Sequence, residues 1–120
     1  MATGKIQNPF SIVETGTSNG WTYWLYADNT VVATRTIATT LTNYATVGSF
    51  YGYTIANIST PFTMTDVDYY VGCDWSVGTG FSIPAGRLNR STTGFNAYCL
   101  SSGSGTVAVS LRMHLIGKKA

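Results

Sequence analysis

Few residues of this chain could carry out catalysis. The sequence contains a single histidine, His114, and a single glutamate, Glu14. A glycosidase needs two carboxylates beside the scissile bond, and neither a C-x-x-C nor an H-E-x-x-H spacing is present to bind zinc. A Ser-His-Asp set would depend on His114, for which an exposed position or a subunit contact is the simpler interpretation. We expect no catalytic residue, no metal and no cofactor.

The other polar and aromatic residues could bind a ligand, and one group of them lies in Val67–Trp75, VDYYVGCDW. Strict alternation places Asp68, Tyr70 and Asp74 on one face of an extended strand. They could be solvated surface groups. Alternatively, the carboxylates could accept hydrogen bonds from sugar hydroxyls while the tyrosine donates one. Trp75 alternates toward the core, although a ring at a strand end could also cap a ligand pocket.

A second group lies in Pro84–Tyr98, the most polar loop-like segment. It contains Arg87, Asn89 and Arg90, whose side chains are all hydrogen-bond donors. One interpretation is a hairpin with a solvated tip. In the other, the hairpin projects and its rim contacts sugars or phosphates, because a guanidinium group binds an anion through two parallel hydrogen bonds. A teichoic-acid-like polymer would supply such phosphates.

Aromatic residues also cluster in the run WTYWLY near the start of the chain. Alternation places Trp21 and Tyr23 in the core beside Leu25, since large aromatic side chains dominate small β cores. Trp24 and Tyr26 take the opposite face. There they could form a subunit contact or a second apolar layer, or Trp24 could stack on a sugar, whose C–H groups suit the negative face of an indole ring.

Short strands must hold these residues in place. No segment shows helical periodicity, whereas period-2 alternation is plain in Val67–Trp75 and Gly105–Gly117. The other expected strands are Ser11–Thr15, Trp21–Tyr26, Thr30–Ala38, Ser49–Ile58, Gly80–Ile83, Arg87–Thr93 and Phe95–Leu100. The expected turns are Asn19-Gly20, Asp28-Asn29, Gly78–Gly80, Pro84-Ala85-Gly86 and Ser101–Gly105.

This spacing predicts an all-β fold, an antiparallel β-sandwich of the jelly-roll type with eight or nine short strands and no substantial helix. We expect residues 1–10 to be a lead-in and residues 11–120 to form one domain. Cys73 and Cys99 both alternate inward on strands that could be neighbours, and we expect them to be buried thiols.

Composition limits the possible partners. Only 10% of the residues are charged and the net charge is +2, against about a quarter charged in ordinary soluble domains. Scattered arginines argue against nucleic acid binding, and no apolar run approaches the roughly 20 residues of a membrane span. A surface so poor in charge suits an extracellular β-protein, a virion part or a subunit that buries much of itself in an oligomer.

Three stretches resemble the C-terminal domains of bacteriophage tail-fibre and baseplate proteins. IVETGTSNGWTYWLYADNTV resembles their opening E-x-G step, G-W-T-Y strand and turn. TPFTMTDVDYYVG resembles their P-F-x-F step into a strand, and VAVSLRMHLIGKKA resembles their closing strand. The stretches occur in matching order and cover about residues 11–119. The sequence departs from the pattern at Trp24 and Leu25, where basic residues are usual, at Tyr26, where Trp is usual, and near Arg35, where another aromatic residue is usual.

The resemblance implies a β-sandwich head at the distal end of a phage tail appendage. Such heads form homotrimers, associate with other tail or baseplate proteins and adhere to polysaccharide or protein on the host surface. A virion location, after synthesis in the bacterial cytoplasm, follows from the same resemblance. The alternatives are a structural, trimerising or decorating tail domain without a ligand of its own, and a carbohydrate-binding module of a secreted enzyme.

Overall fold

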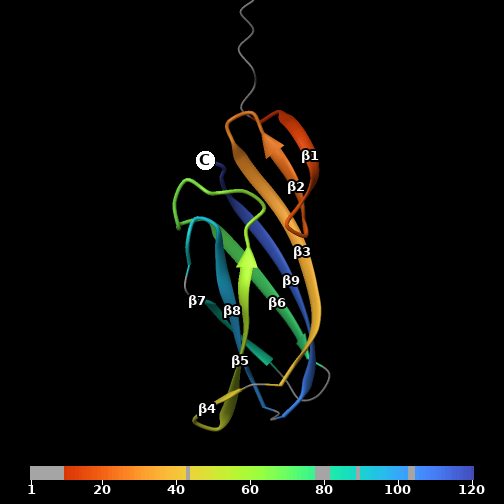
Figure 1. The fold of residues 1–120 in the computed structure, drawn as a ribbon, viewed down its shortest axis with the longest axis vertical. Helices are drawn as coiled ribbons and strands as arrows, with labels where there is room; N and C mark the ends of the chain where they lie inside the picture. Colours follow the sequence, from red (N-terminus) through yellow and green to blue (C-terminus); the bar gives the residue numbers. More distant parts are fainter. Residues whose placement is uncertain (1–9, 43, 78–81, 89, 103–104) are drawn as a thin grey trace, which may run out of the picture.

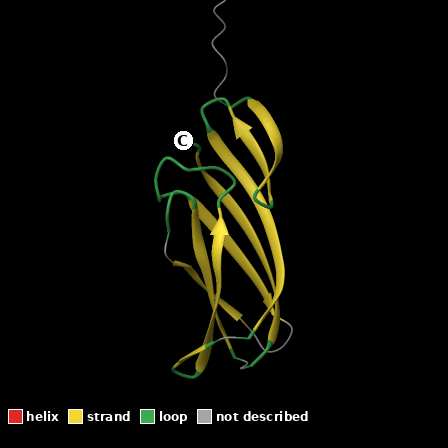
Figure 2. Ribbon diagram, viewed as in Figure 1, coloured by secondary structure: helices red, strands yellow, loops and turns green. Residues whose placement is uncertain are grey.

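The computed structural model describes residues 10–42, 44–77, 82–88, 90–102 and 105–120. They form nine strands connected by turns and loops, and no helix occurs among them (Figures 1 and 2). The strands are β1 (Ile12–Ser18), β2 (Trp21–Tyr26), β3 (Thr30–Leu41), β4 (Ala45–Val47), β5 (Phe50–Ser59), β6 (Tyr70–Val77), β7 (Ser82–Leu88), β8 (Gly94–Ser101) and β9 (Val107–Lys118).

Two antiparallel sheets make up the sandwich. One has the strand order β1-β2-β3-β9-β6 and the other the order β4-β5-β8-β7. The pairing is nested: β3 pairs with β9, β5 with β8, and β6 contacts β7 across the two sheets. Such nesting results when a long hairpin folds over on itself, as in jelly-roll domains. The predicted all-β, jelly-roll-like sandwich of eight or nine strands is confirmed.

Alternating side chains build the core between the sheets. In β9, Val107, Val109, Leu111, Met113 and Leu115 are all buried, whereas Arg112 and His114 between them are exposed. β8 alternates in the same way, with Phe95, Ala97 and Cys99 buried. Because successive residues of a strand point to opposite faces, the apolar members of both strands pack into the same layer.

The β1–β2 hairpin is covered by a crossing segment rather than by a strand of the second sheet. After β5 the chain crosses between the sheets through residues 59–64. Three of its consecutive carbonyl groups accept side-chain hydrogen bonds from the hairpin: Ser59 from Trp21 Nε1 at 2.6 Å, Thr60 from Asn19 Nδ2 at 2.8 Å, and Pro61 from Ser18 Oγ at 2.5 Å. These bonds give the three carbonyl groups hydrogen-bond partners where the chain has left the sheet and no strand can supply them.

The predicted inward faces are largely confirmed. Trp21, Tyr23 and Leu25 are buried, and the Tyr23 ring meets Phe62 of the crossing segment edge-on at 4.7 Å between centroids. The Tyr23 hydroxyl also donates to Glu14, and this hydrogen bond is the largest contribution to the raised pKa of Tyr23. The lone glutamate is therefore a hydrogen-bond partner of a core tyrosine.

Two turns that the sequence predicts are present. Asn19 and Asn29 adopt positive φ angles of 51° and 67°, a conformation that asparagine tolerates better than most residues. Asp28 supports the second turn, because its Oδ1 accepts a hydrogen bond from the Thr30 amide at 3.0 Å.

Other predicted boundaries were wrong. Gly80–Ile83 and Arg87–Thr93 are not two strands around a Pro84-Ala85-Gly86 turn; residues 82–88 form the single strand β7, and its register shifts between Pro84 and Arg87. A β-bulge accommodates Pro84 and Gly86 there. β7 lies at the edge of its sheet, and an edge strand tolerates the missing amide donor of a proline.

Three further differences concern the start of β6, an additional strand and the two cysteines. Val67 lies in the exposed loop before β6 instead of on its inner face. The short strand β4 was not predicted. The two cysteines lie in different sheets, Cys73 in β6 and Cys99 in β8, instead of on neighbouring strands; both are free thiols as predicted, Cys99 buried and Cys73 only half-buried. Burial raises the pKa of the Cys99 thiol to about 11.

Matched tryptophan substitutions test the two faces of β2. Trp21→Phe removes the donor to the Ser59 carbonyl and leaves a cavity where the fully buried indole lay, so we expect the free energy of unfolding to fall by about 2–4 kcal/mol. Trp24→Phe changes a half-buried ring on the outer face and should cost less than about 1 kcal/mol. Urea unfolding followed by circular dichroism measures both, and equal losses would contradict the assignment of the faces.

Candidate functional site

The outer face of the five-stranded sheet brings several predicted ligand-binding residues together. The register pairs Trp24 of β2 with Val32 of β3, Val32 with Ile116 of β9, and Ile116 with Tyr70 of β6. These four side chains form one row across the sheet, which we call the aromatic row. Trp24 and Tyr70 lie near its two ends, three strand spacings or about 14 Å apart.

Tyr70 is the most exposed member of the row. It is 61% exposed and Ile116 beside it is 48% exposed, whereas Trp24 and Val32 are half-buried. The Tyr70 ring extends over Gly72, where an added Cβ would lie 2.9 Å from the tyrosine hydroxyl. Because Gly72 has no side chain, the Tyr70 ring can rest on the backbone there.

A groove of about 250 Å³ opens beside Tyr70, where β6 begins and β9 ends. Asp66, Asp68 and Lys118 contribute to its lining. Asp66 Oδ1 accepts a hydrogen bond from the Asp68 amide at 2.8 Å, which fixes the approach to β6 as an Asx turn. A flat ring next to carboxylates and an ammonium group can combine stacking with hydrogen bonds to hydroxyls.

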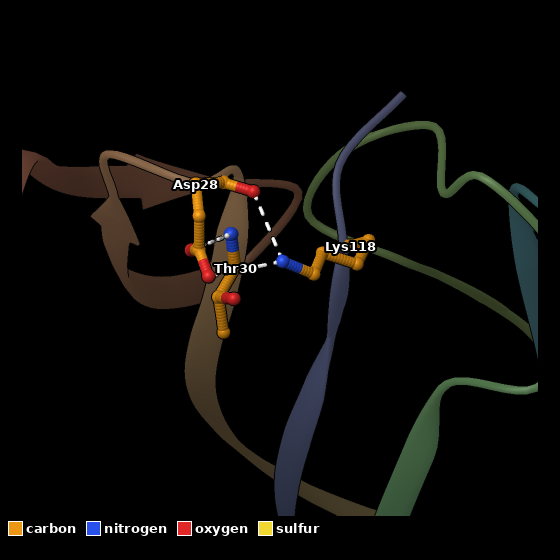
Figure 3. Close-up of polar contacts among 3 residues, drawn as sticks. All are labelled: Asp28, Thr30 and Lys118. Carbon is orange, nitrogen blue, oxygen red and sulfur yellow. Dashed lines mark hydrogen bonds and ion pairs between the residues drawn. The ribbon is translucent and has the colours of Figure 1, made fainter. Parts of the chain in front are cut away.

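Lys118 is fixed by a contact that connects the first and last parts of the fold. Its Nζ lies 3.0 Å from Asp28 Oδ2 and donates to the Asp28 carbonyl at 3.1 Å (Figure 3). Hydrogen bonds from the Thr30 hydroxyl and amide, followed by the one from Lys118, lower the pKa of Asp28 to about 2. In the part of the chain that the structure describes, this is the one ion pair.

Below the aromatic row the same face becomes polar. The next rows contain Thr34, His114 and Gly72, then Thr36, Arg112 and Asp74. Asp74 and Arg112 are direct cross-strand partners, an arrangement in which opposite charges are favourable. Both are exposed, as is His114.

Two of the remaining predicted residues, Trp75 and Arg90, lie away from this face. Trp75 is only 7% exposed and packs in the core, which confirms the inward position that alternation predicts and leaves little of its ring for the alternative role at a ligand pocket. Arg90 is exposed but follows β7, in the other sheet. Asn89 lies outside the described residues, and of Arg87 only the backbone is described.

Ile116 and Lys118 belong to the site but were not predicted. Ile116 could have been found, because it is an apolar residue on the otherwise polar face of β9. Lys118 has no such signal, since its role depends on the register that places Thr30 opposite it.

Catalytic groups do not assemble on this face. The segment Gly16–Gly20 fits the letters G-x-S-x-G, but it connects two strands rather than a strand and a helix. Ser18 donates to the Pro61 carbonyl on the inner side, whereas His114 is exposed on the outer side. Within the described ranges, no three His, Cys, Asp or Glu side chains come together to hold a metal ion.

The chain matches no protein-family model, no curated protein and no solved structure. Among the residues the structure describes, none belongs to a helix with the length and apolar character needed to cross a membrane.

Acid unfolding tests the contact between Asp28 and Lys118. A folded-state pKa of about 2, below the ordinary 3.8, means that the ionised Asp28 stabilises the fold above pH 3.8 and that this contribution is lost as the pH falls toward 2. Asp28→Asn keeps a side-chain oxygen for Thr30 but cannot titrate. We expect the melting temperature of the wild type to fall more steeply than that of the variant from about pH 4 to about pH 2; parallel curves would contradict the assignment.

Proposed function

We propose that this chain is the adhesive head of a bacteriophage tail fibre or baseplate protein and that it binds host-surface glycan through the outer face of the five-stranded sheet. The order of the three family-like stretches along the chain supports a phage origin. The β-sandwich fold is compatible with it. The ligand would be a polysaccharide or a teichoic-acid-like polymer. The role is binding, without catalysis.

One observation carries the glycan assignment: Trp24 and Tyr70, from strands far apart in the sequence, share one register row on one face. Asp74 lies on that face and Asp68 in the groove at its end. Two rings about 14 Å apart, with hydrogen-bonding groups beside them, can contact a short stretch of polymer at several points.

The size of the apolar area also favours a ligand over a subunit seam. The aromatic row and the neighbouring Ile12–Tyr26 pair span roughly 19 Å by 14 Å, or about 270 Å². A stable protein interface buries about 800 Å² on each partner. The row and this pair alone are therefore too small for a seam, and Phe10, 79% exposed, adds apolar surface where it lines a hollow with Tyr26 and Val32. Functional surface patches commonly have an area of a few hundred Å².

Substitution of Tyr70 tests the binding face. Tyr70→Ala should weaken adhesion of the domain to host cells or to an arrayed host glycan by about 2- to 10-fold, the contribution expected of one aromatic contact. Tyr70→Phe keeps the ring and should retain most of the binding. Val47→Ala, on the remote strand β4, is the control for an exposed apolar change. Equal binding by Tyr70→Ala and the wild type would contradict the assignment.

The head is further proposed to work as a homotrimer, because linked weak sites gain avidity through their effective concentration. The 10% charge of the chain supports an assembled form, although the trimer must bury surface beyond the aromatic row.

Size-exclusion chromatography with light scattering measures the oligomer directly. We expect a mass three times the 12.9 kDa of the chain. A monomer that still binds glycan would favour a carbohydrate-binding module, and a trimer that binds no host surface would favour a structural tail domain.

A further inference from the structure

Two neighbouring hollows lie on the outer face of the four-stranded sheet, opposite to the face discussed above. The first, of about 270 Å³, lies where the end of β5 meets the start of β8. The second, of about 280 Å³, lies over β4, β5 and β8. Asn96 lines the first and Tyr98 the second. Two residues apart on one strand, they stand about 7 Å from each other on the same side, so the hollows follow one another along β8.

A β-bulge shapes the first hollow. The register of β5 against β8 shifts between Ile55 and Ile58, and within the shift Asn57 adopts a φ of 57°. A left-handed residue inside a strand is unfavourable for any side chain but is tolerated best by asparagine. The conformation is held in place because the Asn57 amide donates to Asn96 Oδ1 at 2.9 Å.

This arrangement leaves hydrogen-bonding groups available at the hollow. Asn96 uses its oxygen to hold the bulge, and its Nδ2 has no protein partner among the described residues. The side-chain amide of Asn57, which is exposed, has none in that part of the chain either. Thr93 adds a hydroxyl that contacts the Ser91 hydroxyl at 3.2 Å, whereas Ser91 Oγ is already engaged, since it accepts from the Thr93 amide at 3.2 Å and donates to the Gly94 carbonyl at 3.3 Å. Amides and hydroxyls together provide donors and acceptors side by side.

Gly94 keeps the floor of the first hollow open. A Cβ at this position would lie 2.8 Å from the Ile58 carbonyl oxygen, a backbone atom that cannot swing aside. The φ of Gly94 is not positive, so a close approach of the two strands, rather than an unusual backbone conformation, accounts for glycine here.

The second hollow adds aromatic surface. Tyr98 extends over Gly52 and leaves its ring half-exposed, next to Thr54. Tyr44 also contributes to the lining, but its ring packs against Tyr51 and Tyr53, at 5.2 Å and 5.8 Å between centroids, and these two side chains point toward the inner face of the sheet. Tyr98 therefore supplies the ring of this hollow, with an aromatic face and a hydroxyl group.

We propose that these two hollows form one binding site for a short neutral oligosaccharide, with sugar hydroxyls bound by Asn57 and Asn96 and a sugar ring resting on Tyr98. The site extends the proposed glycan binding to a second surface, but its evidence is independent of the aromatic row. Hydroxyl groups donate and accept in the same way as the amides and hydroxyls that line the first hollow.

Charge and shape define the ligand class. None of the described residues that line the two hollows is Asp, Glu, Lys, Arg or His, so these lining residues offer a phosphate or carboxylate no ionic partner. A bound peptide strand would need an unpaired sheet edge for its main chain, whereas both hollows lie over paired strands. A neutral sugar needs neither an ionic partner nor an unpaired sheet edge.

Asn57→Gly is the sharpest test. Glycine adopts a φ of 57° without penalty and so preserves the bulge, but it removes the side-chain amide. We would titrate ¹⁵N-labelled wild-type chain with cellohexaose, maltohexaose and chitohexaose at up to about 10 mM, which exceeds the roughly millimolar Kd of a weak site. A galacturonate hexamer and a Gly-Ser peptide are the charged and non-sugar controls.

The proposal expects saturable shifts of the Asn57, Asn96 and Tyr98 amides with at least one neutral sugar and none with the two controls. Asn57→Gly should weaken that binding by about 2- to 10-fold and leave the melting temperature unchanged or slightly higher. Tyr98→Leu should weaken it to a similar extent.

Failure of this site can be distinguished from failure of the aromatic row. Shifts confined to the Trp24 indole and to residues around Tyr70 would overturn the second site and leave the proposed function standing. No shift at Asn57, Asn96 or Tyr98 with any neutral sugar, equal shifts with the Gly-Ser peptide, or unchanged affinity in Asn57→Gly would each overturn it as well.

Discussion

The fold depends on how the chain crosses from one sheet to the other after β5. Every peptide group that leaves a ladder inside a sandwich must find another partner, since a buried, unsatisfied carbonyl costs about 1–3 kcal/mol. Ser18, Asn19 and Trp21 supply these partners to three successive carbonyls. On the other side, the amides of Thr60 and Met64 donate to the carbonyls of Thr93 and Thr92. The crossing therefore ties the first hairpin to the turn before β8.

This crossing also leads to both proposed binding surfaces. Five residues after it, the chain reaches two consecutive tyrosines that point in opposite directions. Tyr69 is buried, and its hydroxyl donates to the carbonyls of Ser91 and Gly94, beside the hollow on the four-stranded sheet. Tyr70 is exposed on the five-stranded sheet. Tyr69 thus stabilises the turn beside one proposed surface, and the next residue, Tyr70, exposes its ring at the other.

Much of the fold could be predicted from alternation alone. The inward residues of β9 and β2 were identified because a strand with one buried face must place apolar side chains at every second position. The prediction failed where tertiary context decides: Pro84 and Gly86 signal a turn locally, yet β7 continues through them by a bulge. Trp24, Tyr70 and Asp74 could be assigned to outer faces, but their common face depends on the strand order, which no local pattern contains. Asn57 lacked any signal, because its left-handed backbone arises only from the register of β5 against β8.

The ladder between β3 and β9 has a consequence for biogenesis. Thr30 is paired with Lys118 and Leu41 with Val107, so the central strand of the larger sheet gains its second neighbour only when nearly the whole described chain has left the ribosome. Until then one side of β3 presents open amide and carbonyl groups, the kind of surface that recruits foreign strands. Closing so large a loop is slow. Nascent chains should therefore be prone to aggregation during synthesis. Slower translation or a lower expression temperature should raise the soluble yield of this domain.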